Sequence, residues 1–250
     1  MIWPLLRTPR WIGFSVVVVV VIVAFGLLSA WQWGRAEERR AEGIALLAAV
    51  DQAPVDLMDD LRDAGEWTPV LISGTYVAEA QTLVRKRPLN ARNGFWVMTP
   101  LRASTGTVWI NRGWVAAQSD ALASPTVAEP PLGTVTVQGY LRAAPDAVAA
   151  RNVGLPDGQV SDPDPAVLPD VDALPGTYVQ LSSSTPAETG IQPLPLPESD
   201  DSRNLSYAVQ WLLFALVAMG GWFFFLRREA LEEAAAADVE SDAVSAAPSR

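Results

Sequence analysis

The chain has 250 residues, of which 18 are basic and 28 acidic, and its net charge is -10 with a pI near 4.5. It contains no cysteine and no histidine, which excludes disulfides, zinc sites with cysteine or histidine ligands, cysteine nucleophiles and Ser-His-Asp triads. The negative charge argues against nucleic acid as a partner, because phosphate binding needs a basic surface.

The first feature along the chain is a long apolar stretch. Residues 12–30 are apolar or small and carry no charge, and about 20 such residues span a bilayer. We therefore predict an N-terminal segment over residues 1–11 and a transmembrane helix over residues 12–31. A cleaved signal peptide is the alternative, but the stretch is longer than the apolar core of such a peptide.

Residues 32–206 are predicted to form the domain between two spans. A charged and then Ala/Leu-rich stretch predicts short helices over residues 35–63, one of them over 55–62. Farther on, β-branched and aromatic runs alternate with Gly, Pro, Asn and Asp, which predicts a small antiparallel sheet or barrel over residues 66–183. Residues 143–176 are dense in Pro, Asp, Ala and Gly, which predicts a long exposed insertion.

A second uncharged apolar stretch, residues 207–226, predicts another transmembrane helix, with Trp211 and Trp222 near its ends as interfacial anchors. Arginines flank the spans on both sides, so their count does not decide the orientation. Long loops translocate largely regardless of charge, and an N-terminal Arg-flanked span inserts as a signal anchor. We expect cytoplasmic termini, an extracytoplasmic domain, and a largely disordered tail over residues 227–250. The predicted fold class is an α+β membrane protein with two transmembrane helices enclosing a small antiparallel, barrel-like β domain.

The segment VWINRGWV, residues 108–115, carries Asn111 and Arg112 inside an apolar, aromatic run that breaks at Gly113. On a strand, one side of such a run faces the core and the other faces outward. The residues alone favour a structural role, in which Asn111 satisfies a turn and Arg112 pairs with a carboxylate. A contact surface is the alternative, because Arg and Trp are favoured contact residues. No metal site is predicted, since the acidic pairs of the chain do not follow the spacing of a calcium loop.

Six short signatures occur in order between and within the two spans: WQWGR (31–35), GTY (74–76), NGFWVMTPL (93–101), GTVWINRGWV (106–115), VQGYLR (137–142) and NLSYAVQW (204–211). Together they resemble the Surfeit-locus-one family, in its bacterial, actinobacterial type. These membrane proteins assist the assembly of cytochrome c oxidase, and the resemblance implies a helical hairpin with a soluble domain between its spans. It also implies a multi-pass protein of the bacterial cell membrane that is not an enzyme.

The resemblance implies help with the insertion of haem a into oxidase subunit I, or with the stabilisation of that subunit. The implied partners are subunit I, the haem a synthesis machinery and the lipid bilayer, with haem a as a transient ligand and no protein-bound metal. Bacterial members implicated in haem binding usually carry a histidine before the second span, in the pattern N-H-L-x-Y, whereas Asn204 occupies that place here. A scaffold that stabilises an oxidase intermediate without binding haem is the alternative, and a membrane-anchored extracytoplasmic hydrolase is a third.

Two groups of residues follow as hypothetical sites. The first lies at the outer ends of the spans and contacts haem or a partner, with an arginine available for propionates; its members are Trp31, Gln32, Arg35, Arg203, Asn204, Tyr207 and Trp211. The alternative for this group is simple anchoring and hydrogen bonding between two helices. The second group is an oxidase docking surface on the β domain, made of Arg85, Arg87, Asn111, Arg112 and Trp114.

Overall fold

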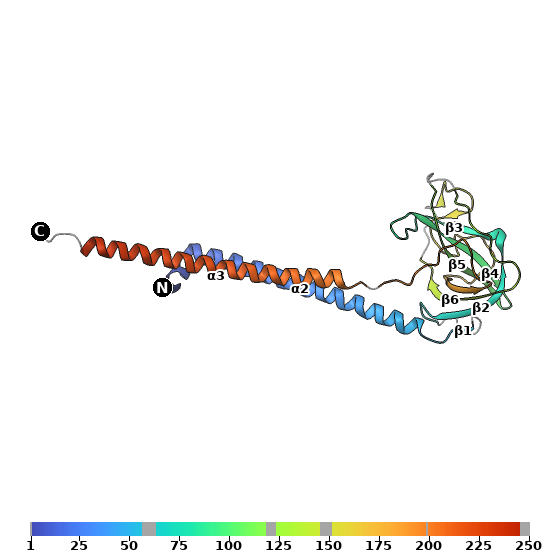
Figure 1. Ribbon diagram of the computed structural model, residues 1–250, viewed down its shortest axis with the longest axis horizontal. Helices are drawn as coiled ribbons and strands as arrows, with labels where there is room; N and C mark the ends of the chain where they lie inside the picture. Colours follow the sequence, from blue (N-terminus) through green and yellow to red (C-terminus); the bar gives the residue numbers. More distant parts are fainter. Residues whose placement is uncertain (1, 57–63, 119–123, 146–151, 199, 246–250) are drawn as a thin grey trace. The chain divides into compact units, whose positions relative to one another are not determined.

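The structure is a computed structural model of the chain, and it describes residues 2–56, 64–118, 124–145, 152–198 and 200–245. The chain divides into two compact units, one made of residues 1–43 and 198–250 and the other of residues 44–197. The first unit is helical, and the second contains the β-strands (Figure 1).

The helices are α1 (Ile2–Leu6), α2 (Pro9–Val50) and α3 (Ser202–Ser245). α2 and α3 are both long and apolar enough to cross a membrane. Large apolar side chains such as Val20, Leu27 and Val217 are mostly exposed on them, which suits helices that are surrounded by lipid. The two apolar helices and the β domain between them confirm the predicted fold class.

α2 differs from the prediction because it does not end with the span. It continues without a break to Val50, through residues rich in Ala, Glu, Arg and Leu, which are strong helix formers. The predicted helical piece over 55–62 is wrong at its start, because Val55–Asp56 forms strand β1, which pairs in parallel with β2 (Pro69–Tyr76). Residues 57–63 lie outside the described residues.

α3 also extends beyond its apolar stretch. The prediction of a largely disordered tail over residues 227–250 is wrong as far as Ser245, where the helix ends. The tail is rich in Ala and Glu, which favour a helix, and Arg228 pairs with Glu232 one turn later at 2.8 Å. Residues 246–250 lie outside the described residues.

Five strands close into a barrel: β2, β4 (Gly94–Ala103), β5 (Gly106–Ala116), β6 (Val135–Ala143) and β8 (Thr177–Thr185). They follow the order β2-β6-β8-β5-β4, and the pairing of β4 with β2 completes the ring (Figure 1). All neighbours are antiparallel except β5 and β8. This is the strand order of a five-stranded Greek-key barrel of the OB-fold kind. The predicted barrel is thereby confirmed.

The sheet continues past β4 through two short strands. β3 (Thr82–Val84) follows the 3-10 helix η1 (Ala78–Ala80) and pairs with β4, and β7 (Gln159–Val160) pairs with β3. β7 belongs to the insertion of residues 143–176. The prediction that this insertion is exposed agrees with Val153, which is 83% exposed, but it is wrong for Val160 and Leu168, which are buried in one apolar cluster with Trp109 and Tyr178.

β5 is buried along both of its faces, from Thr107 to Val115. Its Val108 and Ile110 belong to the main cluster, which also holds Val70, Leu101, Val137 and Val179 from the other barrel strands. Trp109 belongs to the cluster that includes the insertion, and Val115 to a third cluster with Ile191. The expectation that one side of this segment faces outward is therefore wrong, because segments far away in the sequence cover its outer side.

Candidate functional site

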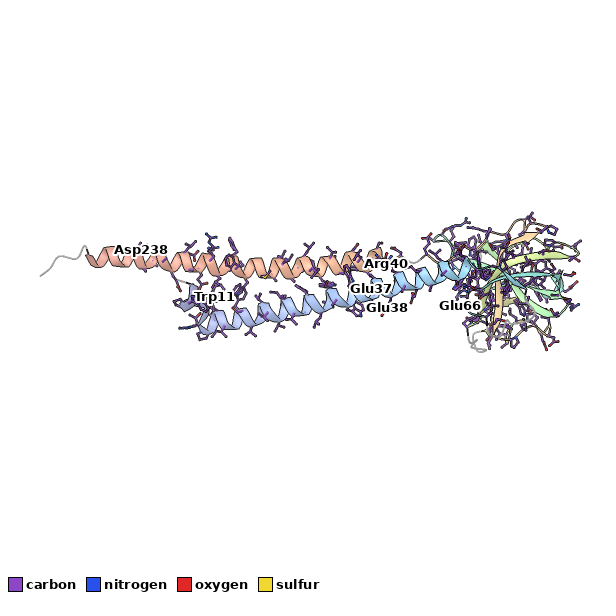
Figure 2. All side chains as sticks on the ribbon, turned by 90° about the horizontal axis from the view of Figure 1, so that it is seen from below. Trp11, Glu37, Glu38, Arg40, Glu66 and Asp238 are labelled. Carbon is purple, nitrogen blue, oxygen red and sulfur yellow. The ribbon has the colours of Figure 1, made fainter. Side chains whose placement is uncertain are left out.

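α2 and α3 pack as an antiparallel pair. The Ser29 hydroxyl donates a hydrogen bond to the carbonyl oxygen of Ala208 at 2.9 Å, and the rings of Phe25 and Trp211 stack with centroids 5.5 Å apart. Figure 2 shows Trp11 near one end of the pair and Arg40 near the other, where Arg40 pairs with Asp201 at 2.9 Å. In this register the helix-end residues of α2, which are residues 31, 32 and 35, lie at the same height along the pair as those of α3, which are residues 203, 204, 207 and 211.

Two of the helix-end residues face the neighbouring helix. Gln32 lies three residues after Ser29 and four before the buried Ala36, so it shares their face of α2 and is half-buried. Asn204 lies four residues before the fully buried Ala208 on α3 and is also half-buried. Small side chains at Ser29 and Ala208 let the two backbones approach each other.

The other helix-end residues have different surroundings. Trp211 is accounted for by its stacking on Phe25. Arg35 is exposed and donates to Glu38 at 2.9 Å, and the remaining three, Trp31, Arg203 and Tyr207, are exposed. The group therefore splits into residues that hold the helix pair together and residues that present polar and aromatic side chains to lipid, a ligand or a partner.

Arg112, at the centre of β5, is fully buried and saturated with partners. Its guanidinium pairs with both carboxylate oxygens of Glu188, at 2.9 and 2.6 Å. It also donates to the side-chain oxygen of Gln81 at 2.7 Å and to the carbonyl oxygens of Ala128 and Glu129, both at 3.3 Å. Buried charges are tolerated only when paired in this way. Arg112 thus ties three segments to the barrel: the one before β3, the one before β6 and the one after β8.

A β-bulge explains how Arg112 reaches these partners. Met98 of β4 pairs with Asn111 and Val97 pairs with Gly113, so Arg112 is the extra residue between them. The Asn111 side-chain oxygen accepts the N–H of Gly113 at 3.2 Å inside the bulge. The sequence prediction that Asn111 satisfies a local turn and Arg112 pairs with a carboxylate agrees with these contacts.

The proposed docking surface changes accordingly. Asn111, Arg112 and Trp114 are each at most 4% exposed, so a partner cannot reach them while the domain is folded. The prediction that these three residues belong to a docking surface is wrong, because β5 is buried on both of its faces. Arg85 and Arg87 remain as partly exposed members.

Arg87 and Trp114 belong to one packed arrangement beside β3. The Trp114 ring N–H donates to the Arg87 carbonyl oxygen at 2.6 Å, and the Arg87 guanidinium lies 4.6 Å from the centre of the Trp96 ring. Arg87 also donates to the Ser161 carbonyl oxygen at 3.0 Å and lies 3.7 Å from Asp162. Burial lowers the pKa of Arg87, and the charge of Asp162 opposes that effect.

The family model described as the SURF1 family matches residues 19–216, which include parts of both apolar stretches and the whole barrel. The chain belongs to the SURF1 family. SURF1-like proteins of Mycobacterium bovis and of two strains of Mycobacterium tuberculosis are 30% identical to it over 237 residues, 90% of this chain and 86% of theirs. The resemblance inferred from the six signatures is confirmed.

Several glycines in the SURF1-like signatures lie where strands approach other groups closely. A Cβ on Gly94 would overlap the Trp114 ring, and one on Gly139 would lie against the carbonyl oxygen of Gln180. Gly113 approaches the carbonyl oxygen of Gln192 in the same way. These signatures therefore report on barrel packing, and they do not by themselves mark a binding site.

Sequence reasoning missed three residues that matter in this SURF1-family domain. Glu188 and Gln81, the partners of Arg112, carry no local signal, because the first follows β8 and the second precedes β3. Lys86 was also missed, although it is the one lysine of the chain and lies between Arg85 and Arg87. Its position in that run of cations was the available signal.

We expect the close approach of α2 and α3 to be detectable by cross-linking. The chain has no cysteine, so the double substitution Ser29→Cys and Ala208→Cys adds the only thiols. Because these positions are in contact, mild oxidation should join them within one chain, which non-reducing gels and mass spectrometry would detect. The matched pair Ala30→Cys and Ala208→Cys should cross-link far less, since Ala30 is exposed. Equal yields from both pairs would contradict this register.

Two buried tyrosines should make the SURF1-family domain sensitive to alkaline pH. Burial raises the pKa of Tyr76 and of Tyr178, and the Glu188 carboxylate raises that of Tyr76 further. Above about pH 10 the unfolded chain loses these protons while the folded domain retains them, so stability falls by up to about 1.4 kcal/mol per pH unit for each tyrosine. Urea unfolding of wild type and of Tyr76→Phe/Tyr178→Phe at several alkaline pH values measures this slope. The variant should show a shallower loss, and an equal loss would assign it to other groups.

Proposed function

We propose that this protein assists the assembly of cytochrome c oxidase in the bacterial cell membrane, as an assembly factor and not as an enzyme. The observation that carries the proposal is membership of the SURF1 family over residues 19–216, together with a barrel inserted between two apolar helices. In this proposal both termini lie in the cytoplasm and the barrel lies outside, where it meets oxidase subunit I and the haem a synthesis machinery.

The exposed residues at the helix ends are the proposed contacts with the assembling subunit or its haem a. Trp31 and Tyr207 offer aromatic surface, and Arg203 offers a cation for a carboxylate. Haem a is the cargo of this reaction and not a resident cofactor. The chain holds no histidine, Arg35 is already paired with Glu38, and Trp211 is packed on Phe25. This residue set does not provide the usual axial ligand of a haem protein.

The same observations favour a second candidate function, a scaffold that stabilises subunit I without touching haem. Absorption spectroscopy separates the two. Purified protein from cells that make haem a should show a Soret band that falls in Tyr207→Ala if the helix ends handle haem. A colourless wild-type protein whose deletion still lowers oxidase content would favour the scaffold.

The proposal as a whole is tested in a strain that lacks the protein. Membranes of that strain should show a several-fold lower haem a absorbance and oxidase activity, restored by the wild-type gene. Restoration by a chain carrying Phe223→Leu, an apolar change on an exposed helix position, serves as the control for expression of a variant. Normal oxidase spectra in the deletion strain would overturn the proposal.

A further inference from the structure

The loop between β3 and β4 concentrates positive charge on an acidic chain. Residues 85–92 contain Arg85, Lys86, Arg87 and Arg92 and no acidic residue, whereas the whole chain has a net charge of -10. A local cluster of this kind creates a positive potential where the rest of the surface is negative.

The loop borders two hollows that differ in their charge balance. The first, of about 500 Å³, contains Arg87 together with Asp162, which lies 3.7 Å from it. The second, of about 540 Å³, is lined within the described residues by three cations, two amides and apolar groups: Arg85, Lys86, Arg92, Asn93, Gln118, Phe95, Ala117 and Gly94. Of the two hollows, the second is the one whose described lining contains several cations and no carboxylate.

Lys86 and Arg92, at the rim of the second hollow, are exposed. Neither makes an ion pair with any residue inside the described ranges. Phe95, which also lines the hollow, is 4% exposed and belongs to a buried apolar cluster, so it is held in the core. Two exposed cations beside amides and apolar groups are the composition of an anion-recognition site.

Three residues of this loop, one of them the cation Lys86, have an unusual backbone conformation. Lys86, Asn90 and Ala91 have positive φ angles of 56°, 50° and 59°, which side chains other than glycine adopt at a cost. The turn is closed by hydrogen bonds between Leu89 and Arg92 at 2.9 and 3.0 Å. Strain retained in a single exposed loop is a reason to look for a binding role there.

We propose that the hollow lined by Lys86, Arg92 and Phe95 binds an acidic peptide segment of a partner protein. The cations that line the hollow come from both ends of the loop, Arg85 and Lys86 from its start and Arg92 from its end, and several carboxylates along an extended chain can meet them. The amides of Asn93 and Gln118 can donate to the same carboxylates or to the peptide backbone.

The test uses the full-length protein in a neutral detergent and a fluorescein-labelled hexaglutamate peptide, with binding followed by fluorescence anisotropy. Lys86→Glu and Arg92→Glu should each weaken binding about three- to tenfold, because each replaces an attraction by a repulsion of similar size. Arg102→Glu is the matched control, since Arg102 is an exposed arginine of β4 that does not line the hollow. It changes the net charge equally and should leave the affinity unchanged.

Absence of peptide binding, or equal weakening by Arg102→Glu, would overturn the proposal. So would displacement of the peptide by inorganic phosphate at matched ionic strength, because the hollow would then be a site for small anions. The variants should retain the native tryptophan fluorescence, since both substituted side chains are exposed. The measurement contains no oxidase, and its failure is therefore distinguishable from failure of the assembly role, which the deletion strain tests.

Discussion

Arg112→Ala is expected to lower the free energy of unfolding of the β domain by about 3–5 kcal/mol. The substitution leaves the Glu188 carboxylate, whose side chain is only 10% exposed, without the cation that lies 2.6 Å from it in the wild type. It also removes the donor that satisfies Gln81 and the carbonyl oxygens of Ala128 and Glu129. A loss of this size is a large share of the stability of an ordinary domain.

Urea unfolding of the full chain in neutral detergent, followed by tryptophan fluorescence, measures this loss, because Trp109 and Trp114 are buried beside the site. Arg102→Ala removes an exposed arginine from the neighbouring strand and should change stability by no more than about 0.5 kcal/mol. The double variant Arg112→Met/Glu188→Leu should recover part of the loss, since no unpaired charge remains buried. Similar losses for Arg112→Ala and Arg102→Ala would show that the buried pair contributes little.

Gly113→Ala is expected to destabilise the domain by about 2–6 kcal/mol, from backbone strain and overpacking together. Gly113 has a φ angle of 138°, which favours glycine. An added Cβ would press on the carbonyl oxygen of Gln192 and lie 2.8 Å from a methyl group of Ile191. The bulge could relieve this overlap only by moving β5 away from the segment that covers it.

Gly106→Ala is the matched control for that substitution. Gly106 lies on the same strand with a φ angle of 153°, but an added Cβ would meet no atom within 4 Å. Its substitution should cost about 1–3 kcal/mol, the backbone share alone. The difference between the two variants in urea unfolding therefore isolates the contact with Gln192. Equal losses would assign the whole effect to the backbone conformation.

The two β5 predictions concern stability, and they bear on function through the docking surface. The contacts of Arg112 with Glu188 and of Trp114 with the Arg87 carbonyl oxygen give both residues a structural role inside the domain. Loss of oxidase in a variant at either position would therefore report an unfolded domain. The exposed cations Lys86 and Arg92 are better positions for testing contact with a partner, because their substitution leaves the core intact.

The two apolar helices could be predicted from the sequence because an uncharged apolar run of about 20 residues is by itself enough to indicate a membrane span. The strand-forming runs were equally readable from β-branched and aromatic residues. The order of six signatures between the spans was sufficient to recognise the SURF1 family, and the lack of histidine was sufficient to question a haem ligand. The continuation of α2 to Val50 and of α3 to Ser245 also has a local cause, because both extensions are rich in Ala and Glu, which are strong helix formers. The sequence therefore contained this signal.

Other features depended on contacts between distant segments. Arg112 meets a carboxylate 76 residues later in the chain, and the bulge that directs it arises only when β4 pairs with β5. Val160 and Leu168 of the insertion are buried because they pack against Trp109 and Tyr178, which the Pro- and Asp-rich composition of the insertion does not predict. The cations of residues 85–92 become a site only where Phe95 and Ala117 complete the hollow. Composition and periodicity report the environment of each segment, but which segments meet is decided when the barrel closes.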